Sequence, residues 1–244
     1  MSWRRSLATA RRVLRQLRHD PRTIVLLLAV PCVLQVLVHE LFRDRPQVFQ
    51  SLGVPLLGLF PFVAMFIVTS ITMLRERTSG TLERLLTTPI ARGDLLAGYA
   101  LAFAIVAAAQ AILVSTLSFG LLGLESSHRP AVIALAIANA VLGMSLGLFA
   151  SAFARTEFQA VQFMPAFVLP QILLCGLLVP RDEMAGWLQA VSAVLPLTYA
   201  YDALARLADP DPFDARFWLD VAVVLGVTYL GLALGAATLR RRTP

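Results

Sequence analysis

The chain has 244 residues, of which 58% are hydrophobic and only 15% are charged, with a formal net charge of +6. Soluble globular domains carry about 25% charged residues, so this composition excludes an ordinary soluble domain and indicates a protein that faces lipid. A spanning helix needs about 20 apolar residues, so the length leaves room for about six spans joined by short loops.

All 21 basic residues are arginine, because the sequence contains no lysine. A P-loop needs a lysine that reaches the nucleotide phosphates. We therefore expect no Walker A site in this chain, and any ATP that drives it must bind to another subunit. Cys32 and Cys175 lie in apolar runs, so we expect inert, buried thiols rather than a disulfide or a redox pair.

Residues 1–20 are predicted to form an amphipathic helix at the membrane interface. Apolar residues recur at spacings of four and three, at Trp3, Leu7, Ala10, Leu14 and Leu17. The remainder is covered by Arg4, Arg5, Arg11, Arg12, Arg15 and Arg18, which are expected to face anionic headgroups. A disordered basic tail is the alternative. No apolar core follows the Arg4-Arg5 pair directly, so we expect the segment to be retained rather than cleaved as an export signal.

Six apolar segments follow, and each is long enough to span a membrane. They cover residues 23–41, 52–74, 95–122, 131–153, 158–179 and 217–239. Between the last two, residues 180–215 hold two shorter amphipathic pieces separated by Pro196. The first piece is too short to cross a bilayer, so we predict a helical hairpin that dips into one leaflet or lies on it. One further span is the alternative, which Pro196, Asp202 and Arg206 disfavour.

Arginine placement predicts the orientation in the membrane. With a cytoplasmic N-terminus, the inner segments carry 15 arginines and the outer loops carry six, as the positive-inside rule requires. We therefore predict an all-α membrane protein with six spans and both termini in the cytoplasm. Residues 1–244 form one membrane domain, and the re-entrant hairpin at 180–215 is extracellular.

The polar residues at membrane depth are amides, and no ionisable residue lies at the middle of a predicted span. We expect these amides to form hydrogen bonds between helices rather than substrate contacts. The amide residues in the predicted spans are Gln35, Gln110, Asn139, Gln159, Gln162 and Gln171. Their neutrality argues against a proton- or sodium-coupled carrier. Two GxxxG patterns, 143–147 and 231–235, favour packing within one subunit over a dimer interface.

No catalytic or metal site is expected, because no His/Asp/Glu cluster, nucleophile–base pair or metal-ligand spacing occurs at either predicted membrane face. The chain is therefore not expected to be an enzyme. No substrate-binding residue is designated from the sequence.

The cytoplasmic loop at 75–94 is the candidate functional segment. Leu82, Leu85 and Leu86 lie at i, i+3 and i+4 on one face of a short helix that ends at Pro89. Such a helix suits docking into a groove on a soluble partner. The pattern alone fits equally well a linker that rests on the membrane.

The run from Arg75 to Pro89, RERTSGTLERLLTTP, resembles the hallmark cytoplasmic loop of ABC transporter type-2 permeases. That family includes daunorubicin-resistance-type and polysaccharide exporters. A second stretch resembles the family's fifth span, outer hairpin and Pro-Leu-Thr-Tyr motif, at Leu169-Pro170, Gly176, Pro180, Trp187-Leu188 and Leu195-Pro196-Leu197-Thr198-Tyr199. The resemblance covers nearly the whole chain in length and topology.

The resemblance implies a coupling helix that contacts an ATPase subunit through Gly80, Thr81, Leu82, Glu83, Arg84, Leu85, Leu86, Thr87 and Pro89. It also implies that the N-terminal helix touches that subunit. Two permeases, identical or related, would pair with the first and fifth spans lining the path. ATP and Mg would bind to two copies of the ATPase, and no cofactor would bind to this chain.

The expected function is therefore the permease subunit of an exporter in a bacterial plasma membrane. Its cargo would be an amphipathic drug, lipid or glycolipid-like molecule. Membrane lipids are expected partners, and nucleic acid is not. Two alternatives stay open at this point: a stand-alone carrier and a membrane scaffold that transports nothing.

Overall fold

A computed structural model of the chain describes residues 3–79 and 92–238. These residues form helices joined by short loops, and no strand occurs among them. In chain order the helices are α1 (Trp3–Arg18), α2 (Pro21–Leu41), α3 (Pro46–Thr78), α5 (Arg92–Gly120), α6 (Arg129–Ala150), α7 (Glu157–Leu174), α8 (Gly186–Ser192), α9 (Pro196–Arg206) and α10 (Ala215–Ala237), with a 3-10 turn at Arg181–Glu183. The predicted all-α class is confirmed.

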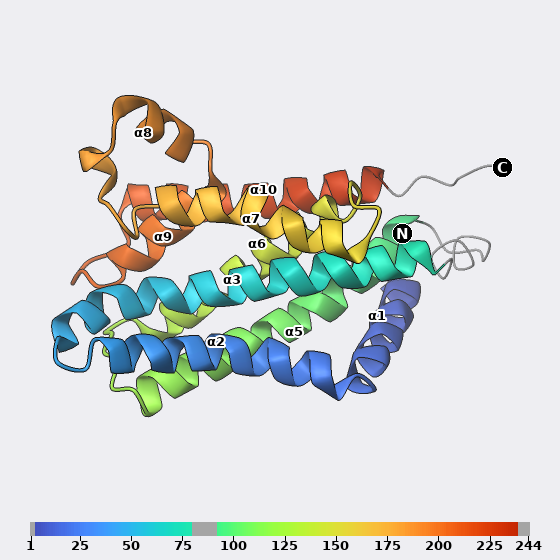
Figure 1. Cartoon of the computed structure of the whole chain (residues 1–244), viewed down its shortest axis with the longest axis horizontal. Coiled ribbons are helices and arrows are strands. Elements are labelled where there is room, and N and C mark those ends of the chain that lie inside the picture. The colour runs from blue at the N-terminus through green and yellow to red at the C-terminus, as the bar shows by residue number, and fades with distance from the viewer. Residues whose placement is uncertain (1–2, 80–91, 239–244) are drawn as a thin grey trace.

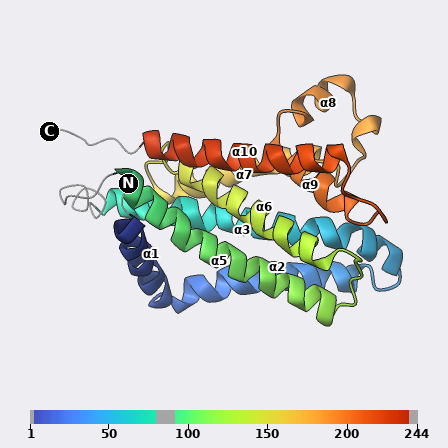
Figure 2. The same ribbon diagram turned by 180° about the vertical axis from the view of Figure 1, so that it is seen from behind.

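The long helices lie side by side, and α1 crosses one end of their bundle (Figures 1 and 2). Within the described residues, five helices are long and apolar enough to cross a membrane: α2, α3, α5, α6 and α10. The predicted fifth span corresponds to α7, which has 18 residues and is not one of these five. Three glutamines and two prolines interrupt its apolar sequence, so the structure supports a multi-pass protein without confirming six spans.

The centre of the bundle is the crossing of α3 and α6, where the backbones approach closely. A Cβ atom at Gly143 would lie 2.2 Å from the Phe62 carbonyl oxygen, and one at Gly147 would lie 2.5 Å from the Phe66 carbonyl oxygen. Only glycine fits at such distances. This GxxxG pattern therefore packs within the subunit, as the sequence predicts.

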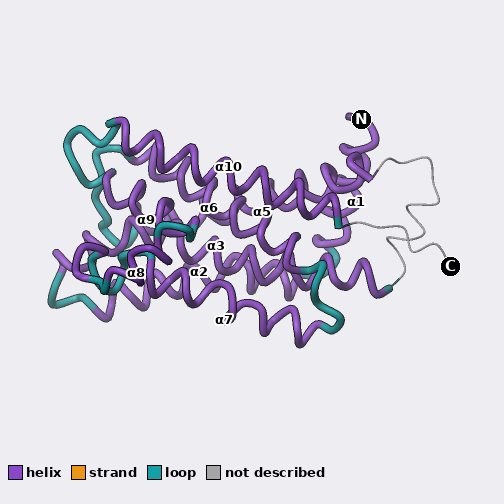
Figure 3. Tube along the Cα trace, turned by 90° about the horizontal axis from the view of Figure 1, so that it is seen from above, coloured by secondary structure: helices purple, strands orange, loops and turns teal. Residues whose placement is uncertain are grey.

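Both α2 and α7 pack against α3, and α7 lies on the opposite side of the bundle from α10 when seen from above (Figure 3). Helices α8 and α9 lie at the end of the bundle opposite α1, and α8 projects outward from it (Figure 1). With 7 and 11 residues, both are too short to span a bilayer. The predicted pair of short helices broken at Pro196 is present, although α8 begins at Gly186 after the 3-10 turn.

Candidate functional site

The predicted coupling segment lies, in the sequence, between two helix ends that the structure describes. Its nine named residues, from Gly80 to Pro89, lie outside the described residues, so their coupling role stays a prediction. The structure describes the anchors on either side: α3 ends at Thr78, and α5 begins at Arg92. Both anchors lie at the end of the bundle that α1 crosses (Figure 1).

A cluster of three side chains joins α1 to both anchors. Arg12 on α1 donates a hydrogen bond from Nη2 to the Tyr99 hydroxyl on α5. The same Nη2 lies 3.6 Å from Oε2 of Glu76, in the last turn of α3. The guanidinium also lies 5.6 Å from the centroid of the Tyr99 ring, within the range of a cation–π contact. One arginine therefore links the helix that enters the predicted coupling segment with the helix that leaves it.

This cluster is largely withdrawn from water, which strengthens its electrostatics. Tyr99 is fully buried, and the Glu76 side chain is only 4% exposed. A buried carboxylate needs a cationic or hydrogen-bonding partner to offset its lost hydration. Arg12 supplies the cation that offsets the cost of burying the Glu76 carboxylate.

The placement of Arg12 corrects one part of the sequence prediction. All the arginines of α1 were expected to face headgroups, but Arg12 turns inward toward Glu76. Helical periodicity assigned it to the polar face, because the pattern within one helix carries no information about a partner 64 positions away in α3. Glu76, which follows Arg75 in the sequence, was the available signal for a buried cation, and the sequence analysis did not use it.

Close packing between α1 and α5 fixes the position of Arg12. A Cβ atom at Gly98 of α5 would lie 2.4 Å from Thr9 Cβ and 2.7 Å from the Ser6 carbonyl oxygen. Ser6 and Thr9 are buried together with Ala10 and Val13. Small residues on both helices thus allow α1 to lie directly on α5, while Trp3 and Leu7 remain exposed on a different face.

A second ion pair ties the end of α3 to the start of α7. Arg75 donates from Nε and Nη2 to the two carboxylate oxygens of Glu157, at 2.8 and 2.9 Å. This bidentate geometry is the strongest that an arginine and a carboxylate can form. The hydrogen bonds from Arg75 lower the pKa of Glu157 below its usual value. The anchor of the coupling segment is therefore connected to α7 as well as to α1.

The opposite end of the bundle carries an ionic network that joins α9 to its neighbours. Arg181 lies 3.0 Å from Asp202, and Arg206 lies 3.3 Å from Asp214. Burial raises the pKa of the Asp202 carboxyl, while Arg181 opposes that shift. The sequence analysis used Asp202 and Arg206 as an argument against a further span and counted Arg181 and Arg206 among the arginines of the outer loops, without predicting that these charges pair.

Asp220 is a buried member of this network that the sequence analysis missed. It lies in α10 with no exposed side-chain surface, 3.6 Å from Arg206 and 3.6 Å from Arg216. The spacing of Arg216 and Asp220, one helical turn apart, was the available signal. The two arginines offset the charge of a carboxylate that would otherwise be costly to bury.

The Pro-Leu-Thr-Tyr motif stabilises the turn between α8 and α9. Thr198 donates from its hydroxyl to the Ser192 carbonyl oxygen at 2.8 Å, and Tyr199 donates to the Ala193 carbonyl oxygen at 2.6 Å. The Leu197 backbone N–H donates to the Gln171 side-chain oxygen at 3.4 Å, which links α7 to α9. Leu197, Thr198 and Tyr199 of the motif therefore have structural roles, because their hydrogen bonds hold α9 against α7 and the end of α8.

The other amides at membrane depth divide into two groups. Gln35 donates to the Gly53 carbonyl oxygen at 3.1 Å, and Gln110 donates to the Leu27 carbonyl oxygen, so both join neighbouring helices as predicted. Asn139 is buried near Gly58. In contrast, Gln159 and Gln162 are exposed on α7, and Gln159 accepts a hydrogen bond from the Arg155 backbone N–H just before that helix, so their role in joining helices stays a prediction. Among the described residues no group of three metal-ligating side chains occurs.

The sequence of this chain is similar to a known protein family and to individual proteins of two bacteria. A family model described as "ABC-2 type transporter" matches residues 6–207. The chain is 28% identical over 190 residues to the "Probable multidrug ABC transporter permease YbhR" of Escherichia coli K12, covering 77% of this chain and 51% of that protein. It is also 28% identical over 167 residues to the "Linearmycin resistance permease protein LnrN" of Bacillus subtilis, covering 68% of this chain and 42% of that protein. The chain thus spans about half the length of YbhR and less than half the length of LnrN.

Proposed function

Because the chain belongs to the ABC-2 type transporter family, we propose that it is the membrane permease of an exporter driven by ATP on a separate subunit. The observation that carries the proposal is the Arg12–Glu76–Tyr99 cluster. It connects α1 to both helices that flank the predicted coupling segment. A force applied to that segment would therefore act on α1, α3 and α5 together.

The absence of lysine from the sequence supports a separate site of ATP hydrolysis. ATP and Mg would bind to two copies of a partner ATPase, which would dock on Gly80–Pro89 and on α1. The Arg75–Glu157 pair would extend the same movement to α7. Rigid-body movement of this kind changes transport only if the cargo binds the two states with different affinity.

We place six spans in the membrane, with α7 as the fifth and both termini in the cytoplasm. An 18-residue helix is about 27 Å long, which approaches the thickness of the hydrocarbon core. The α8–α9 pair would then be the extracellular hairpin. The arginine bias toward the α1 end supports this orientation in a bacterial plasma membrane.

Two permease chains, identical or related, would pair through α2 and α7. Both helices pack on α3 and expose large apolar side chains, among them Leu26 and Leu37 on α2 and Phe158 and Phe167 on α7. Exposed Gln162 lies on the same helix α7, where a polar group facing lipid would be unfavourable. A path between two such faces suits an amphipathic cargo.

The names of the relatives favour a drug as the class of cargo. One is named for multidrug transport and another for linearmycin resistance. We extend these names to this chain as a proposal: it exports an amphipathic drug, lipid or glycolipid-like molecule. The alternatives of a stand-alone carrier and of a scaffold that transports nothing are separated from it by the experiment below.

The test combines co-purification with transport. Leu82→Asp with Leu85→Asp is expected to leave membrane insertion intact and to release the ATPase in a pull-down, because two carboxylates cannot enter an apolar groove without a large desolvation cost. Leu121→Asp, at an exposed position just after α5 and outside the predicted coupling segment, is the matched control and is expected to retain the partner. Transport by the purified permease without ATP would identify a stand-alone carrier. Unchanged cargo accumulation after deletion of the chain, with the ATPase still bound to the intact protein, would identify a scaffold.

A further inference from the structure

The exposed face of α1, which points away from α5, is strongly basic. Its positive charge is not neutralised by acidic side chains recorded among the described residues. Arg4, Arg11 and Arg15 are exposed, and α1 contains no acidic residue. Within residues 3–79 and 92–238, the recorded ion pair between Arg12 and Glu76 does not involve Arg4, Arg11 or Arg15. Three exposed cations therefore lie along one side of a single helix without a recorded carboxylate partner.

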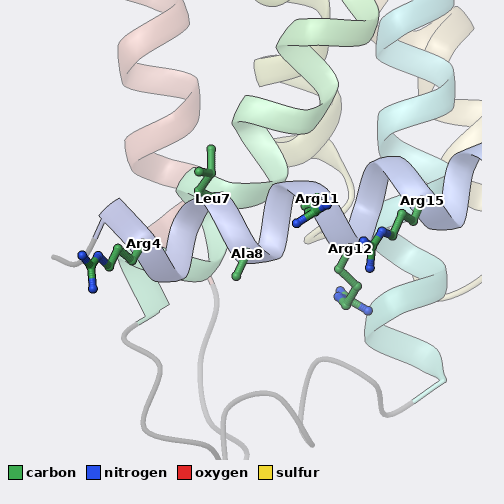
Figure 4. A pocket seen from close by; sticks show the side chains of 6 residues that line it. All are labelled: Arg4, Leu7, Ala8, Arg11, Arg12 and Arg15. Atoms are coloured by element: carbon green, nitrogen blue, oxygen red, sulfur yellow. The ribbon is translucent and has the colours of Figure 1, made fainter.

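These arginines line a hollow on the surface of the protein. Its volume is about 470 Å³, and its lining residues are Arg4, Leu7, Ala8, Arg11, Arg12 and Arg15. Figure 4 shows the Leu7 side chain pointing along the spans toward the bundle, whereas Arg4 and Ala8 point to the other side of α1. The helix rises about 1.5 Å per residue, so Arg11 lies about 10 Å from Arg4 and about 6 Å from Arg15 along the axis.

Apolar side chains border the basic face on the side toward the spans. Trp3 is 67% exposed and Leu7 is 51% exposed, although both are large and apolar. An exposed tryptophan and leucine beside a row of arginines are typical of a helix at the level of lipid headgroups. The apolar groups contact acyl chains there, while the guanidinium groups reach the phosphates.

We propose that the Arg4, Arg11 and Arg15 face of α1 binds the phosphate group of an anionic phospholipid. Guanidinium groups match the geometry of phosphate oxygens and form charge-assisted hydrogen bonds with them. The acyl chains of the lipid extend along Leu7 and Trp3. The proposal rests on the proposed membrane function only in placing α1 at the surface of a leaflet.

A lipid at this face would act through Arg12 on α3 and α5, the helices that flank the predicted coupling segment. That residue also lines the hollow, and its guanidinium contacts Glu76 and Tyr99. A bound lipid would therefore hold α1 against α5 and keep Arg12 in contact with the end of α3. Anionic lipid is thus a regulator of the permease as well as part of its surroundings.

The test uses the fluorescence of Trp3 in the intact chain. Trp187→Phe with Trp218→Phe leaves Trp3 as the sole tryptophan. The protein is placed in nanodiscs of phosphatidylcholine that contain either brominated phosphatidylglycerol or brominated phosphatidylcholine at equal mole fraction. Bromine quenches tryptophan at short range, so the difference between the two lipids measures enrichment of the anionic headgroup beside α1.

Stronger quenching by the anionic lipid is expected, with an apparent affinity higher by about fivefold for each arginine engaged. Arg4, Arg11 and Arg15 changed together to Gln should abolish the preference, and the same three changed to Lys should retain most of it. Arg43→Gln with Arg45→Gln, at the other end of the bundle, is the matched control and should change nothing. Glycerol phosphate in solution should not compete if the ligand is a membrane lipid.

Equal quenching by the two lipids, or an unchanged preference in the Gln variant, would overturn the proposal. Loss of ATPase binding in the Gln variant, with no lipid preference in the parent protein, would instead assign the face to an acidic protein surface. The quenching measurement itself needs neither ATP nor the ATPase. Its failure is therefore distinct from a failure of the Leu82 and Leu85 experiment.

Discussion

Two ion pairs at the α1 end of the bundle differ in burial. This difference predicts how much each pair contributes to the free energy of unfolding. The Arg12 and Glu76 side chains are 35% and 4% exposed, whereas Arg75 and Glu157 are 58% and 52% exposed. Exposed pairs gain little because water already solvates both charges. A buried charge that loses its partner has no such compensation.

We expect Glu76→Gln to lower the free energy of unfolding by about 1–3 kcal/mol, less than for a fully buried pair because Arg12 is partly exposed. Glu157→Gln should lower it by less than about 1 kcal/mol. Equilibrium unfolding in detergent micelles measures both. In a double-mutant cycle, Arg12→Gln and Glu76→Gln should be non-additive; strictly additive effects would show that the two residues do not interact.

The Arg75–Glu157 pair predicts a specific dependence on pH. Hydrogen bonds from Arg75 lower the pKa of Glu157 from its ordinary value of 4.5. A lowered carboxyl pKa adds stability that is complete above the ordinary value and is lost as the pH falls through the lowered one. The difference in stability between the wild type and Glu157→Gln should therefore be constant from about pH 8 to pH 5 and should shrink below about pH 4. A difference that changes near neutral pH would contradict this assignment.

Among the helices, the α3–α6 crossing is the contact most sensitive to added volume. A Cβ atom at Gly143 would meet backbone atoms of Phe62, which cannot move without displacing α3. We expect Gly143→Ala to lower the free energy of unfolding by about 1–3 kcal/mol, as overpacking does in other cores. Gly226→Ala in α10 is the control, because nothing lies within 4 Å of its Cβ position, and it should be neutral or slightly stabilising. Equal effects of the two substitutions would argue against a tight crossing.

Sequence patterns predict the helices here better than the contacts between them. Long apolar runs identified α2, α3, α5, α6 and α10, because a span must satisfy its backbone hydrogen bonds internally over a known length. The helix ends differ from the predicted ends where polar residues continue a helix beyond its apolar run. The apolar run of α3 was predicted over 52–74, whereas the helix extends over Pro46–Thr78. The inward turn of Arg12 and the burial of Asp220 depend on partners distant in sequence, which periodicity within one helix cannot reveal.

The topology of the whole molecule depends on whether α7 crosses the membrane. If it does, residues just before and just after it face opposite sides. We expect Arg155→Cys to be protected from a membrane-impermeant maleimide added to intact cells and Asp182→Cys to react, in a background with Cys32 and Cys175 changed to Ser. Permeabilised cells, in which both positions should react, provide the control. Labelling of both positions from outside would place α7 on the surface and reduce the count to five spans.

The tight crossing of α3 with α6 also makes α3 a lever with a fixed pivot. The pivot lies at Phe62 and Phe66, where α6 leaves no room for sliding, and Pro61 beside it removes a backbone hydrogen bond that would resist bending. From Phe62 to Thr78 the arm is about 16 residues, or about 24 Å, long. A tilt of about 5° would carry Thr78 through about 2 Å, with Arg12 and Glu157 moving beside it. A small angular change at one rigid crossing would thus become a displacement of about 2 Å at the end of the bundle that α1 crosses.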